Sequence, residues 1–126
     1  MLIPNYLPIT NDQYEQLTST DEDTAVDLAM DWMEEETSGP GTDIDKTADD
    51  LAAALTTPEA KQAVTGHTLL CEDPALYVAS PQQTAVLAQA LADSTVDEDA
   101  QADLDTLTDF YTTAVTNNHA TAILYN

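Results

Sequence analysis

A histidine and the single cysteine of the chain lie four residues apart, as His67 and Cys71. On a helix this spacing would place both side chains on one face, where they could bind a metal or act as a nucleophile and its base. The surrounding residues instead favour a turn followed by a strand, and a metal site would need two further ligands that no motif supplies. We therefore expect a buried structural cysteine and an ordinary histidine.

The second histidine, His119, follows the pair Asn117-Asn118, which is typical of a turn. Its imidazole could act as an acid or a base if a carboxylate oriented it, but no spacing in the sequence supplies that carboxylate. An enzyme or a small-ligand-binding protein would need a pocket built from such residues. The candidates for that pocket are Tyr6, Tyr77 and Tyr111 with one of the two histidines, His67 or His119, and Trp32 is a further candidate.

Closely spaced carboxylates occur at Asp43 and Asp45 and again in the run Asp97-Glu98-Asp99. Oxygen ligands of this kind suit Ca²⁺ or Mg²⁺, but neither group has the glycine and glutamate offsets of an EF-hand loop. The sequence also lacks the phosphate-binding, nucleophile-elbow and zinc-protease motifs. We therefore predict no metal and no cofactor, and the balance leans away from an enzyme.

Trp32 lies near two methionines, Met30 and Met33, and this combination is enriched where proteins bind one another. However, Trp32 and Met33 continue a stripe of apolar residues at helical spacing. Core packing is therefore the preferred interpretation for both, and Met30, which lies off the stripe, is expected to be exposed.

The charge of the chain limits its partners. The 126 residues include 24 carboxylates, no arginine and only two lysines, Lys46 and Lys61, which gives a net charge of −22. Binding to nucleic acid or to an anionic membrane would act against this field, so we predict neither. Three interpretations of the acidity stay open: solubility in the host, attraction to a basic protein, or mimicry of nucleic acid.

One cysteine cannot form an internal disulfide, and residues 1–10 have no positively charged leader segment. No apolar run approaches the roughly 18 residues that a membrane span requires. These features predict a cytoplasmic protein.

Periodicity and capping signals place the elements. Thr10 and Gln13 have the spacing of a capping box, and Ile9 and Tyr14 have that of a hydrophobic staple. Pro4 is expected to place the first strand, residues 2–7, at an edge of the sheet or to make the strand irregular. Helices are predicted from Thr10, over 20–36 and 45–56, from Pro58 to Gly66, over 80–93 and over 97–117, and strands over 68–71, 75–79 and 120–125. The predicted fold is α+β, a single compact domain over residues 1–126 with several helices packed on a small mixed sheet.

Three segments carry a family resemblance. Residues 45–56 resemble the D-K-x-W-x-x-L-x-x-x-L-T helix of the bacterial YfbM-like family of unknown function (domain of unknown function 1877), with Ala48 in place of its tryptophan. Residues 77–83 are similar to the strand-to-helix junction of that family, and residues 107–120 are similar to its closing helix and strand. The resemblance implies an α+β fold and brings no catalytic residues.

Taken together, these features predict an acidic interaction or inhibitor protein, similar in role to an immunity protein, that binds a basic partner. The alternatives are a small-ligand-binding protein or enzyme with a pocket of tyrosine and histidine residues, or a chain whose acidity serves only solubility in its host.

Overall fold

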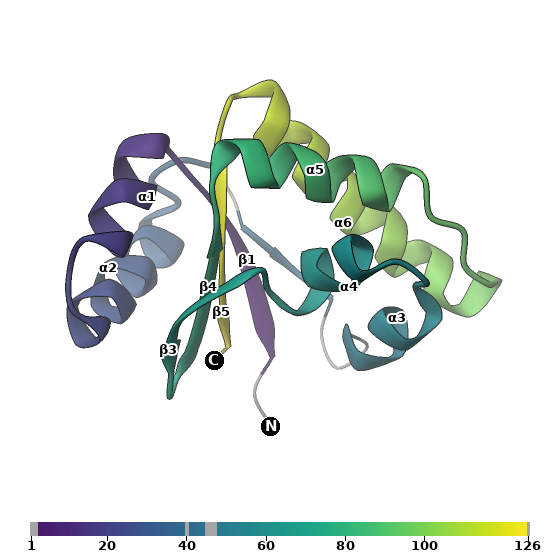
Figure 1. The fold of residues 1–126 in the computed structure, drawn as a ribbon, viewed down its shortest axis with the longest axis horizontal. Coiled ribbons are helices and arrows are strands. Elements are labelled where there is room, and N and C mark those ends of the chain that lie inside the picture. Colours follow the sequence, from purple (N-terminus) through teal and green to yellow (C-terminus); the bar gives the residue numbers. More distant parts are fainter. Residues whose placement is uncertain (1–2, 40, 45–47, 126) are drawn as a thin grey trace.

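The structure is a computed structural model that describes residues 3–39, 41–44 and 48–125. In these ranges a sheet with the strand order β2-β1-β5-β4-β3 separates two layers of helices (Figure 1). The strands are β1 (Pro4–Ile9), β2 (Thr42–Asp43), β3 (Thr68–Glu72), β4 (Ala75–Ala79) and β5 (Ala120–Tyr125). The helices are α1 (Asn11–Thr18), α2 (Glu22–Glu35), α3 (Ala48–Ala54), α4 (Pro58–Thr65), α5 (Pro81–Ala92) and α6 (Glu98–Thr116). The predicted α+β class is confirmed.

The four strand pairings found in the described part of the chain are all antiparallel, so this sheet is not mixed as the sequence led us to expect. The expected edge position of the first strand is also wrong, because β1 lies between β2 and β5. The short strand β2 pairs with Asn5 and Tyr6, so that Pro4 and Pro8 lie outside its ladder. A strand that contains prolines can therefore occupy this position without losing a hydrogen bond to β2.

The capping boxes form as predicted. The Thr10 side chain accepts from the Gln13 backbone N–H at 3.1 Å, and the Gln13 side chain accepts from the Thr10 N–H at 2.8 Å. Ser80 and Gln83 make the same reciprocal pair, at 3.1 and 2.9 Å, at the start of α5. Gly66 follows the last residue of α4, as expected, whereas the proposed cap at Asp45 lies outside the described residues.

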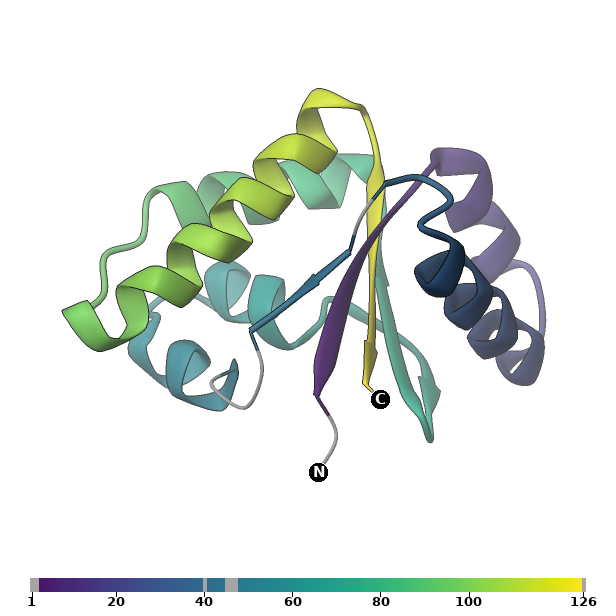
Figure 2. The ribbon, with the colours of Figure 1, turned by 180° about the vertical axis from the view of Figure 1, so that it is seen from behind.

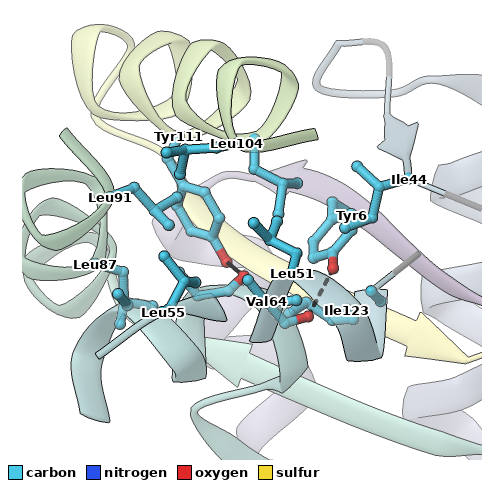
Figure 3. Packing of buried hydrophobic residues seen from close by; sticks show 14 of the residues in the cluster. Tyr6, Ile44, Leu51, Leu55, Val64, Leu87, Leu91, Leu104, Tyr111 and Ile123 are labelled. Atoms are coloured by element: carbon cyan, nitrogen blue, oxygen red, sulfur yellow. Dashed lines mark hydrogen bonds between the residues drawn. The ribbon is translucent and has the colours of Figure 1, made fainter. Parts of the chain in front are cut away.

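The two faces of the sheet carry separate hydrophobic clusters, and α1 and α2 cover one face while α3 to α6 cover the other (Figures 1 and 2). Alternate residues of β5 supply both, since Ile123 belongs to the cluster under α3–α6 and its neighbours Ala122 and Leu124 belong to the other. On β1, Tyr6 likewise belongs to the cluster under α3–α6, and Leu7 belongs to the cluster under α1 and α2. The larger cluster is drawn in Figure 3.

Trp32 and Met33 are half-buried and pack against the cluster under α1 and α2. Met30, which we expected to be exposed, is half-buried and packs against the same cluster. The apolar face of α2 is therefore wider than its stripe suggested, and all three side chains contribute to packing. In the described part of the chain, no helix combines the length and the apolar character that a membrane span needs.

Candidate functional site

Three of the side chains proposed for a pocket do come together. His67, Tyr77 and Tyr111 surround one point on the face of the sheet under α4 and α5, with Leu87 and Ile123 beside them. The space that they enclose has no room for a water molecule. This group is therefore part of the packed core and forms no ligand pocket.

The tyrosine hydroxyls instead satisfy the end of a helix. Tyr111 donates to the carbonyl oxygen of Ala63 at 2.7 Å, and Tyr6 donates to that of Val64 at 2.6 Å (Figure 3). Tyr125 donates to the next carbonyl, that of Thr65, at 2.8 Å. The last turn of a helix leaves its carbonyls without partners inside the helix, and these three hydroxyls supply the missing donors.

Burial raises the pKa of the Tyr6 and Tyr111 hydroxyls well above their ordinary value. Burial also raises the pKa of Tyr125 to about 12, with smaller contributions from Tyr77 and Asp49. All three hydroxyls are therefore protonated donors near neutral pH.

His67 and Cys71 do not form a pair. Cys71 is buried in the cluster under α1 and α2, whereas His67 lies beside Tyr111 on the opposite face of the sheet. The His67 ring instead lies 2.8 Å from the Thr68 hydroxyl through its Nδ1. Among the described residues, no group of three or more histidine, cysteine and acidic side chains is placed to hold a metal ion.

His119 lines an open cleft of about 310 Å³, which we call the α6 cleft. One wall is the C-terminal half of α6, and the other is formed by residues 38–39 and 41–42, which follow α2 and lie beside α6 (Figure 2). Asp109 and Phe110 line the α6 side, and Ser38 and Thr42 line the other. None of the tyrosine candidates reaches this cleft, so the two histidines lie in different environments.

The other residues of the α6 cleft could not be recognised as a site from the sequence. Thr106, Asp109, Thr113 and Asn117 recur every three or four positions and form a polar stripe beside the apolar stripe of α6. This polar stripe is the feature of the sequence from which the cleft could have been predicted. It could not be distinguished from an ordinary solvated face, because the opposite wall comes from a distant part of the sequence.

A second hollow, the acidic groove, lies between α3 and α6 and has a volume of about 270 Å³. Four carboxylates of the described residues line it: Asp50 from α3, and Asp97, Asp99 and Asp103 from the start of α6. Asp97 also caps α6, because its side chain accepts from the Ala100 N–H at 3.2 Å. The proposed cation-binding run at residues 97–99 thus serves the helix start and one side of this groove.

Comparisons with known proteins agree with this fold. The family model described as "Domain of unknown function (DUF1877)" matches residues 1–102. The crystal structure of a protein of unknown function, YfbM from Escherichia coli, superposes with a TM-score of 0.70, covers 100% of both chains and shares 18% identity. No curated protein matches this sequence. The matched segment contains most of the chain, from the first strand to the start of α6, and the chain therefore belongs to the DUF1877 family.

Proposed function

We propose that this chain binds a basic protein partner, and that the acidic groove between α3 and α6 receives lysine or arginine side chains of that partner. The observation that carries the proposal is the gathering of Asp50, Asp97, Asp99 and Asp103 around one hollow, with no basic residue among the described residues that line it. Carboxylates that line the same hollow repel one another, and a bound cation would relieve that repulsion.

The floor of the acidic groove supports the same partner chemistry. Leu51, Ala54 and Ala100 line it between the carboxylates. Lysine and arginine carry apolar stems below their charged heads, so that the stems can pack on this floor while the heads meet the rim. The net charge of −22 would also accelerate the approach of a basic surface.

The position of other acidic residues bears on the alternatives. Asp27 and Asp31 are exposed on α2, which lies across the sheet from the acidic groove. Mimicry of nucleic acid needs carboxylates arrayed along one face, and this two-sided distribution argues against it. The remaining alternative is that the acidity serves solubility alone.

Binding of a fluorescent nona-arginine peptide, followed by anisotropy, tests the proposal. The double variant Asp50→Asn/Asp103→Asn removes two charges from the groove, and Asp27→Asn/Asp31→Asn removes two from α2. We expect the groove variant to weaken binding about tenfold more than the α2 variant, equivalent to roughly 1.4 kcal/mol. Equal weakening by the two pairs would mean that the peptide senses only total charge, and the solubility interpretation would then replace ours.

A further inference from the structure

We propose that the α6 cleft is a binding site for a small organic cation that carries a guanidinium or an alkylammonium group. This site is separate from the acidic groove, and the inference does not depend on the protein partner proposed above. The cleft, at about 310 Å³, falls at the lower end of the volumes of small-molecule sites, which begin at roughly 300 Å³.

The charge of the lining selects a cation. Asp109 supplies a carboxylate, and the described lining residues include no lysine or arginine. An anion would have to enter against this carboxylate and against the net charge of −22, while the same field concentrates cations at the surface. Anionic metabolites are therefore disfavoured as occupants.

Two hydroxyl groups of the lining, those of Thr106 and Ser38, favour a ligand that donates hydrogen bonds. The Thr106 hydroxyl donates its proton to the carbonyl oxygen of Ala102 at 3.0 Å, and the Ser38 hydroxyl donates to the Gln13 side-chain oxygen at 2.6 Å. A hydroxyl has one proton, so both oxygens have only lone pairs left to offer. Together with the Asp109 carboxylate they form a set of acceptors. Guanidinium and ammonium groups are donors without acceptor atoms, which is the complementary set.

Phe110 adds an aromatic component. Its ring packs edge-on against Tyr111, with 5.4 Å between ring centroids, and contacts Tyr6 at 6.1 Å. Both tyrosines are buried and are anchored through their hydroxyls to the end of α4, so the position of Phe110 is fixed before a ligand arrives. An aromatic ring attracts a cation placed over its face, and a preformed ring avoids the entropy cost of ordering on binding.

The test is titration of the full chain with butylguanidinium, butylammonium, butyrate and butan-1-ol at constant ionic strength, followed by backbone amide NMR shifts. We expect both cations to give saturable shifts in the C-terminal half of α6 and around Ser38 and Thr42. Butyrate should give none, and butan-1-ol should bind at least tenfold more weakly than the cations. Binding of butan-1-ol as tight as that of the cations would show an apolar hollow without charge selection and would overturn the proposal.

Variants locate the site. Asp109→Asn removes the carboxylate of the cleft, and Asp105→Asn removes the same charge one turn away, from a residue that does not line it. Thr113→Leu fills the cleft from an exposed helical position and leaves the net charge unchanged. We expect Asp109→Asn to weaken cation binding at least tenfold, Asp105→Asn less than threefold, and Thr113→Leu to abolish it. Equal effects of the two aspartate variants, or full binding by Thr113→Leu, would overturn the proposal.

A final arm identifies the source of the cation. The blocked amino acid N-acetyl-arginine methylamide carries the same guanidinium on a peptide backbone. If it binds as tightly as butylguanidinium, the cleft accepts an arginine side chain of another protein; if only butylguanidinium binds, the ligand is a free small molecule. Absence of saturable shifts with every cation would overturn the proposal, and it would leave the nona-arginine result at the acidic groove unaffected.

Discussion

The hydroxyl of Tyr111 donates to the carbonyl oxygen of Ala63 at 2.7 Å and so joins α6 to the last turn of α4. Tyr6 from β1 and Tyr125 from β5 bind the next two carbonyls, and the backbone N–H of Gly66 binds that of Gln62 at 2.8 Å. All four terminal carbonyls of α4 therefore have donors, three of them from side chains on other elements. This arrangement ties the helix end to the sheet and to α6.

Replacing Tyr111 by phenylalanine should destabilise the protein by roughly 1–3 kcal/mol, because the buried Ala63 carbonyl would lose its donor. Urea unfolding followed by circular dichroism measures the change. Tyr77→Phe is the matched control, since no hydrogen bond of the Tyr77 hydroxyl is found among the described residues, and it should stay within about 0.5 kcal/mol of the wild type. Similar losses in both variants would show that the Tyr111–Ala63 bond has no special weight.

Stability should fall in alkaline solution. The folded-state pKa values of Tyr6, Tyr111 and Tyr125 are raised by burial, that of Tyr125 to about 12, above the value of about 10 for an unfolded chain. Because these pKa values are higher in the folded state, the contribution of the three protonated hydroxyls to the free energy of unfolding is complete below a pH of about 10. It is lost as the pH rises through the folded-state pKa values.

Urea midpoints measured between pH 8 and pH 12 check this expectation, together with phenolate absorbance of the folded protein. The midpoint should be level to about pH 10 and then decline. The variant Tyr125→Phe should decline less steeply, because one of the three groups is gone. A midpoint that is constant up to pH 12 would contradict the assignment of these tyrosines as protonated donors.

Raising the salt concentration should stabilise the fold. The net charge of −22 produces repulsion within the folded chain, and the Debye length falls from about 10 Å at 0.1 M salt to about 3 Å at 1 M. We expect the melting temperature to rise over this range, and to rise less in Asp27→Asn/Asp31→Asn, which starts with two fewer charges. An equally concentrated uncharged solute separates screening from general osmotic effects, and an equal rise with that solute would refute the screening argument.

Local signals were the most predictable part of this fold. The pairs Thr10/Gln13 and Ser80/Gln83 lie three residues apart, so their capping boxes can be identified without knowledge of the tertiary structure. Strand β2 was missed because its two residues carry no periodicity and pair with β1 only through the tertiary fold. The position of β1 inside the sheet was missed for the same reason.

The candidate sites depend more than the helix caps do on contacts between residues that are far apart in the sequence. Tyr6 and Tyr111 were identified as polar aromatic residues, but their carbonyl partners at Val64 and Ala63 lie 58 and 48 residues away. Nothing in the spacing of the tyrosines indicates a helix end as their partner. Likewise, His119 was identified as a histidine near a turn, whereas the second wall of its cleft, at Ser38 and Thr42, is supplied by the fold alone.

Gly66 provides the sharpest test of packing at the end of α4. Its φ of +131° is strained for any other residue, and a Cβ at this position would lie 2.2 Å from the Tyr77 ring. Gly39 has a similar φ of +126°, but its Cβ would meet Pro8 at 3.6 Å, an ordinary contact distance. Gly66→Ala should therefore cost the backbone strain plus about 1–3 kcal/mol of overpacking, and Gly39→Ala the strain alone. In the double variant Gly66→Ala/Tyr77→Ala the clash is absent, because the Tyr77 ring has been removed. A double-mutant cycle measured by urea unfolding should therefore show a smaller loss of unfolding free energy in the double variant than the sum of the losses in the two single variants. Simple additivity would mean that the Tyr77 ring does not confine this glycine.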